Sequence, residues 1–312
     1  MGKLAFIFSG QGAQYVGMGR QIAEEYSKAG QIFDQASEAL GFDLKKMVFE
    51  SDDETLKITE NTQPCILTMS IACLQPLLDK GIKPDVVAGL SLGEYSAHVA
   101  AGTLNFQDAV RLVRKRGKYM QEAVPVGVGT MAAVLGLDDA TVIECCKAAS
   151  DIGVVEPANF NCPGQIVVAG EVKAVEKVVE LCKEKGAKRS MLLPVSAPFH
   201  CSLLKPAGEK LAEELKNVAL NDMKIPLVSN VTADYVNSKD EVKELLNRQV
   251  SNSVLWEKSV NKMLADGVDT FIEIGPGKAL CGFIKKISKD AKALNIEDLD
   301  SLNKTLTEIG AV

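Results

Sequence analysis

The sequence Asp85-Val86-Val87-Ala88-Gly89-Leu90-Ser91-Leu92-Gly93 decides the fold, because it joins a short apolar strand to a G-x-S-x-G turn. Residues 92–101 continue in a helical pattern that stops before Gly102. The glycines at the two ends of the turn permit a sharp bend that lifts the Ser91 hydroxyl out of the sheet edge. We therefore predict Ser91 as a nucleophile; the alternative is that it only caps the N-terminus of the helix.

Strands alternate with helices on both sides of this turn. An apolar strand is expected at 4–8, followed by a Gly-rich loop and a helix at 16–26. A long apolar helix is expected at 64–80, interrupted late by Pro76, and further strands at 224–229 and 268–274. This alternation predicts a parallel sheet with helices on both faces.

The rhythm changes between residues 124 and 194, where the pattern reads β-α-β-β-α-β, the order of a ferredoxin-like unit. We predict an α/β fold in which this small domain (124–198) is inserted into a large, α/β-hydrolase-like domain with a parallel sheet (1–123 and 199–312). Ligands often bind between domains and at the carboxyl ends of parallel strands, so we expect the site in the cleft between the two. The expected strands are 129–135, 153–159, 165–169 and 187–193, and the expected helices are 138–149 and 172–184.

Composition excludes several functions. The 312 residues are 46% hydrophobic and 24% charged, as in an ordinary soluble protein, and the formal charge of -6 disfavours a protein that coats nucleic acid. The apolar run 4–8 is too short for a signal peptide or a membrane span. The eight cysteines include no C-x-x-C pair, which indicates reduced thiols in the cytoplasm.

No cofactor or metal motif is complete. The stretch Gly10-Gln11-Gly12 has Tyr15 where a dinucleotide fingerprint needs its third glycine. The stretch Gly275-Pro276-Gly277-Lys278 is too short for a phosphate-binding P-loop. Because no His, Cys or carboxylate cluster has zinc spacing either, we expect neither a cofactor nor a metal.

A serine nucleophile needs a base, and the chain has two histidines. His98 follows Ser91 on the same helix at a distance of about 10 Å, too far to reach the hydroxyl, and we expect it to be a partly exposed helical residue. His200, in Ser196-Ala197-Pro198-Phe199-His200-Cys201, follows the last strand of the small domain, where the chain re-enters the large one. We predict His200 as the base; the sequence nominates no acid to orient it, so a backbone carbonyl could do so.

Arg116 is an unusual residue on the helix expected at 106–120. It shares the face of Ala109, Val113 and Met120, so its guanidinium points inward among apolar side chains. A buried guanidinium requires a carboxylate partner. That partner is either an acidic residue of the protein or the carboxylate of a substrate, and the pattern does not distinguish them.

Taken together, these motifs resemble the malonyl-CoA:acyl carrier protein transacylases of fatty-acid synthesis, over nearly the whole chain. The stretches that carry the resemblance are Phe8-Ser9-Gly10-Gln11-Gly12-Ala13-Gln14, Gly89-Leu90-Ser91-Leu92-Gly93-Glu94-Tyr95-Ser96-Ala97, Arg114-Lys115-Arg116-Gly117, Asn161-Cys162-Pro163-Gly164-Gln165, Pro198-Phe199-His200 and Glu273-Ile274-Gly275-Pro276-Gly277.

The resemblance implies that Ser91 takes the malonyl group as an ester and that His200 moves the proton. It implies that Gln11 and the N–H of Leu92 form the oxyanion hole, and that Arg116 holds the malonyl carboxylate. In the family a main-chain carbonyl orients the histidine, and the matching residue here is Gln249. The chain departs from the family at Leu90, where a histidine is common, and Phe199 is similar to the residue of malonyl-selecting members.

The resemblance implies malonyl-CoA and acyl carrier protein as partners, and we expect a monomer that binds neither nucleic acid nor membrane. A basic patch of Lys183, Lys185, Lys188 and Arg189 is a candidate docking surface for the carrier, or simply a solvated helix end. Two rival functions remain open at this point. One is a serine thioesterase or esterase that uses water as acceptor; the other is a carrier-binding module without catalysis.

Overall fold

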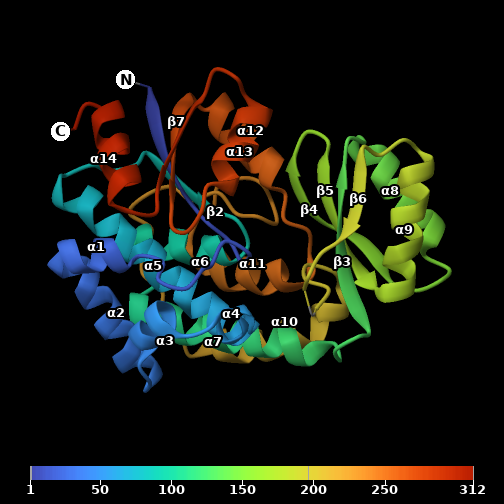
Figure 1. The fold of residues 1–312 in the computed structure, drawn as a ribbon, viewed down its shortest axis with the longest axis horizontal. Helices are drawn as coiled ribbons and strands as arrows, with labels where there is room; N and C mark the ends of the chain where they lie inside the picture. Colours follow the sequence, from blue (N-terminus) through green and yellow to red (C-terminus); the bar gives the residue numbers. More distant parts are fainter. Residues whose placement is uncertain (1, 196, 312) are drawn as a thin grey trace.

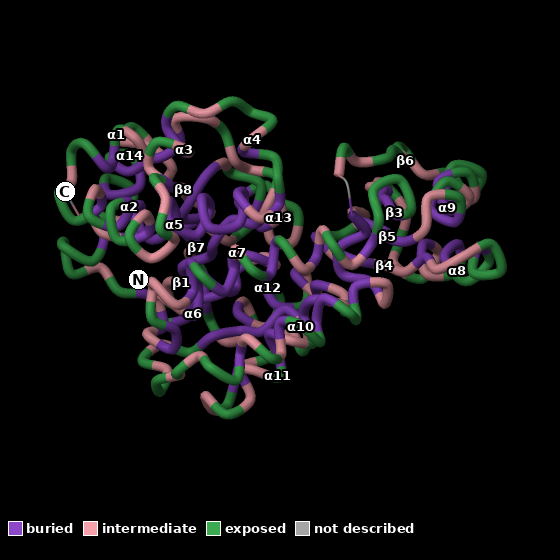
Figure 2. The backbone as a smooth tube through the Cα atoms, turned by 90° about the horizontal axis from the view of Figure 1, so that it is seen from below, coloured by how far each residue is buried: buried purple, intermediate pink, exposed green. Residues whose placement is uncertain are grey.

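The computed structural model describes residues 2–195 and 197–311, and these form two bodies, each with its own sheet (Figure 1). The larger body holds a parallel sheet in the order β2-β1-β7-β8, and the smaller holds an antiparallel sheet in the order β4-β5-β3-β6. The smaller body projects from one side of the larger one in both views (Figures 1 and 2). The predicted α/β class, with a parallel sheet and a second, ferredoxin-like unit, is confirmed.

The parallel sheet brings the carboxyl ends of its central strands to one edge. Phe8 at the end of β1 pairs with Gly89 of β2 on one side and with Ile274 of β7 on the other. The loops that follow these strands therefore leave the sheet side by side, which places Ser9 and Leu90 next to each other. The strands are β1 (Lys3–Phe8), β2 (Val86–Gly89), β7 (Val268–Ile274) and β8 (Lys292–Ile296).

Helices cover both faces of this sheet. Phe6 and Phe8 of β1 belong to one apolar core with α1, α2, α5 and α7, whereas Ala5 and Ile7 belong to another with α12 and α13. This division follows from the alternation of side chains along a strand. The helices of the larger body are α1 (Arg20–Glu25), α2 (Ser27–Leu40), α3 (Leu44–Glu50), α4 (Asp53–Lys57), α5 (Thr59–Asp79), α6 (Leu92–Ala100), α7 (Phe106–Ala123), α10 (Lys205–Lys216), α11 (Lys239–Ser251), α12 (Trp256–Ala265), α13 (Ala279–Ile287) and α14 (Leu299–Glu308), with a short 3-10 helix at Ser202–Leu204.

The smaller body has the predicted β-α-β-β-α-β order. Every pairing in its sheet is antiparallel, and the β4-β5-β3-β6 arrangement is that of a ferredoxin-like unit. Its two helices bury Val142, Val175 and Val178 against the sheet. The elements are β3 (Gly129–Leu135), α8 (Asp139–Ala149), β4 (Val155–Cys162), β5 (Gln165–Glu171), α9 (Val172–Glu184) and β6 (Arg189–Leu192).

The strand expected at 224–229 does not form. Only Leu227 and Val228 make isolated bridges there, the first of them to Val87 of β2. Pro226 lacks an N–H, so the ladder cannot extend through it. In the larger body, β8 is a strand that the sequence reasoning did not identify, and α1 begins at Arg20 rather than at residue 16.

The interruption expected at Pro76 is also absent, because α5 continues through Pro64 and Pro76 to Asp79. From Thr59 to Leu77, all of its residues except Glu60 and Gln75 are buried. Packing on every side stabilises the helix against the hydrogen bonds that the prolines remove.

The two bodies are joined by backbone hydrogen bonds as well as by the chain itself. The N–H of Val254, just after α11, donates to the carbonyl of Ala158 in β4 (2.8 Å), and the N–H of Phe160 donates to the carbonyl of Val254 (2.9 Å).

The domain limits at 123/124 and 198/199 stay a prediction, and Ser196 lies outside the described residues. Within 2–195 and 197–311, no helix is long and apolar enough to cross a membrane.

Candidate active site

Ser91 stands at a strained turn between β2 and α6. Its φ of 53° and ψ of -104° are unusual for a residue with a side chain. The turn is tight because a Cβ on Gly89 would lie 2.0 Å from the carbonyl of Gly93, and a Cβ on Gly93 would lie 2.1 Å from the carbonyl oxygen of Phe8. The Ser91 side chain makes no capping hydrogen bond to α6, so its hydroxyl is free to face the cavity.

Two amide side chains hold the backbone of Ser91 in this conformation. The N–H of Ser91 donates to Oδ1 of Asn230 (2.6 Å), and the Ser91 carbonyl accepts from Nε2 of Gln249 (2.9 Å). Asn230 also donates from Nδ2 to the carbonyl of Gly89 (2.7 Å), so it fixes the strand end as well. The sequence reasoning did not identify Asn230, because an asparagine 139 residues downstream carries no local signal.

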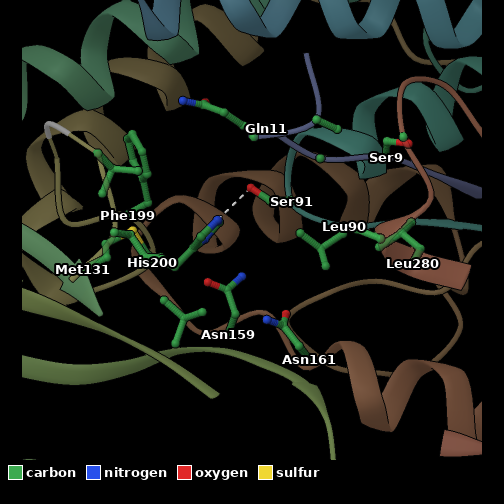
Figure 3. A pocket seen from close by; sticks show the side chains of 18 of the residues that line it. Ser9, Gln11, Leu90, Ser91, Met131, Asn159, Asn161, Phe199, His200 and Leu280 are labelled. Atoms are coloured by element: carbon green, nitrogen blue, oxygen red, sulfur yellow. Dashed lines mark hydrogen bonds between the residues drawn. The ribbon is translucent and has the colours of Figure 1, made fainter. Parts of the chain in front are cut away.

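His200 lies against the Ser91 hydroxyl, as predicted from the sequence. The distance from Ser91 Oγ to His200 Nε2 is 2.6 Å, and His200 Nδ1 lies 2.8 Å from the main-chain oxygen of Gln249 (Figure 3). A carbonyl can only accept, so Nδ1 carries the proton and Nε2 is free to take one from Ser91. Burial, together with the charge of Arg116, lowers the pKa of His200 to about 4, which keeps the ring neutral near pH 7, with Nε2 unprotonated.

The second histidine, His98, has no direct role at Ser91. It is fully buried on α6, so the expectation that it is a partly exposed residue was wrong. Burial lowers its pKa to about 3. The error has a simple cause, since α6 packs between the sheet, α5 and α7 and is buried along its first two turns.

Arg116 reaches the Ser91 hydroxyl from α7. Its Nη2 donates to Ser91 Oγ (3.1 Å) and to Oε1 of Gln249 (2.9 Å), while Nη1 donates to Oε1 of Gln63 (2.8 Å). The side chain is 1% exposed, and its guanidinium lies 5.2 Å from the centre of the Tyr95 ring. No acidic residue of the described chain forms an ion pair with it. The sequence left two possible partners for Arg116, an acidic residue of the protein or the carboxylate of a substrate. The absence of an ion pair favours the substrate carboxylate.

The two expected oxyanion donors lie in the loop after β1 and at the start of α6. The Gln11 side chain points away from Ser91 and donates to Oγ1 of Thr59 (3.3 Å), so only its main-chain N–H is available (Figure 3). Within the described part of the chain, the N–H groups of Gln11 and Leu92 have no hydrogen-bond acceptor. Two free N–H groups beside a nucleophile are what a developing oxyanion needs.

A cavity of about 430 Å³ lies between the two bodies, and Ser91, Arg116 and His200 line it. The larger body contributes Ser91, Arg116 and His200, and the smaller contributes mostly apolar side chains together with two asparagines of β4, Asn159 and Asn161 (Figure 3). Leu90, which stands where the family often has histidine, lines the cavity as well. Cys201, next to His200, is a packed thiol whose pKa burial raises to about 12. Outside Met1, Ser196 and Val312, no cluster of His, Cys, Asp or Glu is placed to hold a metal.

Comparison with known proteins gives one family. The model of the acyl transferase domain matches residues 5–304. The chain is 49% identical to the malonyl CoA-acyl carrier protein transacylase of Bacillus subtilis, over 97% of this chain and 96% of that one. The crystal structure of the transacylase of that name from Clostridium perfringens superposes with a TM-score of 0.96 at 49% identity, covering 99% of this chain and 97% of that one. A malonyl-transacylase in complex with a type II PKS acyl-carrier protein matches with a TM-score of 0.96 at 41% identity, covering 98% of this chain and 99% of that one.

Proposed function

Because this chain belongs to the acyl transferase domain family, we propose that it moves a malonyl group from coenzyme A to the phosphopantetheine thiol of acyl carrier protein through an ester on Ser91. The chain is an acyltransferase of the malonyl CoA-acyl carrier protein transacylase type, and such transfer supplies the extender unit for fatty-acid synthesis. The observation that carries the mechanism is the hydroxyl of Ser91, placed 2.6 Å from a neutral His200 and 3.1 Å from Arg116, which has no carboxylate partner among the described residues.

The first half-reaction forms the acyl-enzyme. Nε2 of His200 takes the proton from Ser91 Oγ while Oγ bonds to the thioester carbon of malonyl-CoA. The resulting oxyanion receives the N–H groups of Gln11 and Leu92. When the tetrahedral intermediate collapses, the C–S bond breaks and His200 returns the proton to the departing thiolate of coenzyme A.

The second half-reaction repeats these steps in reverse order with a new thiol. His200 takes the proton from the phosphopantetheine thiol, whose sulfur attacks the ester carbon, and Ser91 leaves and regains its proton. Throughout, the malonyl carboxylate pairs with Arg116, which fixes the acyl group in one orientation. The main-chain carbonyl of Gln249 holds the His200 ring in the required tautomer.

Docking of the carrier is part of the same proposal. Lys183, Lys185, Lys188 and Arg189 are all exposed on the smaller body and offer a basic surface to an acidic carrier. Charge reversal of these residues should slow transfer to the carrier without changing formation of the acyl-enzyme. A cytoplasmic location agrees with eight buried, free cysteines, and we expect a monomer that works without a cofactor.

The decisive experiment uses intact-mass measurement. The protein is mixed with malonyl-CoA, without carrier, as wild type, as Ser91→Ala and as Ser150→Ala, which changes an exposed serine of the smaller body. We expect a malonyl adduct in the wild type and in Ser150→Ala but not in Ser91→Ala, and we expect its loss when holo acyl carrier protein is added. Steady release of coenzyme A without an adduct would instead indicate a hydrolase. Neither adduct nor release would indicate a carrier-binding module.

A further inference from the structure

Glu94, on the first turn of α6, is a buried carboxylate that the mechanism above does not use. It is 0% exposed, and no cation of the described chain lies within ion-pair distance of it. Its Oε2 accepts from Nε2 of Gln249 (2.6 Å) and from the N–H of Asn230 (3.2 Å). Burial raises its pKa to about 7. A carboxylate in such a place is costly for stability, so its presence calls for a reason in function.

One amide group joins Glu94 to Arg116. The Gln249 side chain donates from Nε2 to Glu94 and accepts at Oε1 from Nη2 of Arg116 (2.9 Å). Above pH 7, where Glu94 is mostly ionised, the two buried, opposite charges therefore face each other across a single polar group rather than in direct contact. An amide oriented between a carboxylate and a guanidinium is polarised by both, which couples the charges in a low-dielectric interior.

The same contacts extend to the reacting residues. Gln249 and Asn230 are the two residues that hold the backbone of Ser91, and the main-chain carbonyl of Gln249 orients His200. Glu94 binds the side chain of the first and the N–H of the second. It touches no reacting atom, so it is a positioning residue.

We propose that Glu94 is the counter-charge of Arg116, acting through Gln249, and that this indirect pairing sets how tightly Arg116 holds a carboxylate on the acyl group. A direct ion pair would occupy the guanidinium and close it to the malonyl group. Without Glu94, a full buried positive charge would bind the malonyl carboxylate so strongly that the malonyl product would leave slowly. The indirect pairing offsets the charge with neutral acceptors on Nη1 and Nη2, which a carboxylate can displace, and it leaves Nε of Arg116 unpaired.

Glu94→Gln tests the proposal, because it keeps the shape and an accepting oxygen but removes the charge. We expect the ratio of kcat/KM for malonyl-CoA to kcat/KM for acetyl-CoA to rise roughly tenfold, mainly through a lower KM for malonyl-CoA. Acetyl-CoA has no carboxylate and should respond little. A merely structural role would change both donors alike, and an unchanged ratio would overturn the proposal.

Glu273→Gln is the matched control. Glu273 is also a buried carboxylate beside the cavity, 1% exposed, but it accepts from the N–H groups of Leu280 and Cys281 and has no link to Arg116. It should leave the malonyl-to-acetyl ratio unchanged. A rise as large as that of Glu94→Gln would mean that any loss of negative charge has the effect, which would contradict the specific pairing.

A double-mutant cycle with Arg116→Ala gives a second readout. In the Arg116→Ala background, Glu94→Gln should no longer affect the ratio, and it should raise the Tm, because Glu94 would otherwise be an uncompensated buried charge. If the single variant Glu94→Gln does not fold, the test is whether the double variant with Arg116→Ala does, since the proposal predicts that removing both charges restores folding. Additive losses of stability would overturn the proposal.

The inference rests on the proposed function, and the two fail differently. If wild type forms no malonyl ester on Ser91, the proposed function fails. If the ester forms but Glu94→Gln leaves the acyl preference unchanged, only the role of Glu94 fails.

Discussion

The two walls of the cavity differ in how far their polar groups are already paired. On the wall of the larger body, Ser91, His200, Arg116 and Gln249 form one connected set of hydrogen bonds. On the wall of the smaller body, the side-chain oxygen of Asn161 is buried without a partner in the described residues, and Asn161 points toward the cavity (Figure 3). On the first wall the side chains already hold one another in place, and the groups left for a ligand are Nε of Arg116 and the N–H groups of Gln11 and Leu92. On the second wall no side chain of the described residues fixes the Asn161 oxygen.

This difference separates chemistry from recognition. Groups that stabilise a transition state act best when they need no rearrangement. The wall of the larger body, with Ser91, His200, Arg116 and Gln249, meets this condition and is the reaction wall; the wall of the smaller body, with Asn161, is the recognition wall. Unpaired polar atoms on the recognition wall cost free energy in the empty protein and regain it when a matching ligand binds. Damage to the reaction wall should therefore affect fold and catalysis, and damage to the recognition wall should affect binding alone.

The largest effect is expected from Gly93→Ala, behind the reaction wall. A Cβ there would lie 2.1 Å from the carbonyl oxygen of Phe8, and neither backbone can move without separating α6 from β1. We expect the free energy of unfolding to fall by about 4 kcal/mol or more, or the protein not to fold. Chemical denaturation gives the measurement.

Gly282→Ala is the control for this change. Gly282 lies in α13, where a Cβ would meet nothing within 4 Å, so alanine should stabilise the protein by up to about 1 kcal/mol. A Gly93→Ala protein as stable as wild type would show that the contact between β1 and α6 is not the tight one described.

A smaller effect is expected from the histidine behind the reaction wall. The pKa of His98 is lowered to about 3 in the folded protein, against about 6.5 in an unfolded chain. The unfolded state therefore binds more protons, and the stability that neutral His98 contributes is complete above pH 6.5 and lost as the pH falls.

Between pH 7.5 and pH 5, this loss should amount to about 2 kcal/mol. Glu94 and Glu273 have raised pKa values and oppose it, so the quantity to measure is the difference between wild type and His98→Gln. That difference should shrink by about 2 kcal/mol over this range. If it is independent of pH, His98 is not held neutral by burial.

The sequence was most informative on the reaction wall, where local rules apply. The G-x-S-x-G turn placed Ser91 because only a strand, a tight turn and a helix satisfy that spacing, and the inward position of Arg116 followed from helical periodicity. The ferredoxin-like order was also legible, since each of its elements has a strong pattern of its own.

What the sequence could not predict depends on contacts between distant segments. Asn230 holds Ser91 from a loop with no regular structure, and Gln249 entered the site only through the family resemblance. The burial of His98 is set by the packing of α5 and α7 around α6, which periodicity on a nine-residue helix does not reveal. The failed strand at 224–229 shows the same limit: Pro226 interrupts its β-like composition, and its two bridges go to different partners, Val87 and Tyr235.

The smallest effect is expected on the recognition wall, from Asn161→Ala. Asn161 is 6% exposed, and its unpaired oxygen is suited to an N–H donor such as an amide of the pantetheine arm that coenzyme A and the carrier share. Its loss should raise KM for malonyl-CoA and for acetyl-CoA by the same few-fold factor, equivalent to about 1 kcal/mol, with kcat unchanged. Asn217→Ala, at an exposed site after α10, is the control and should change neither constant. A fall in kcat would place Asn161 among the groups that act in the transition state, and the distinction between the two walls would then have to be given up.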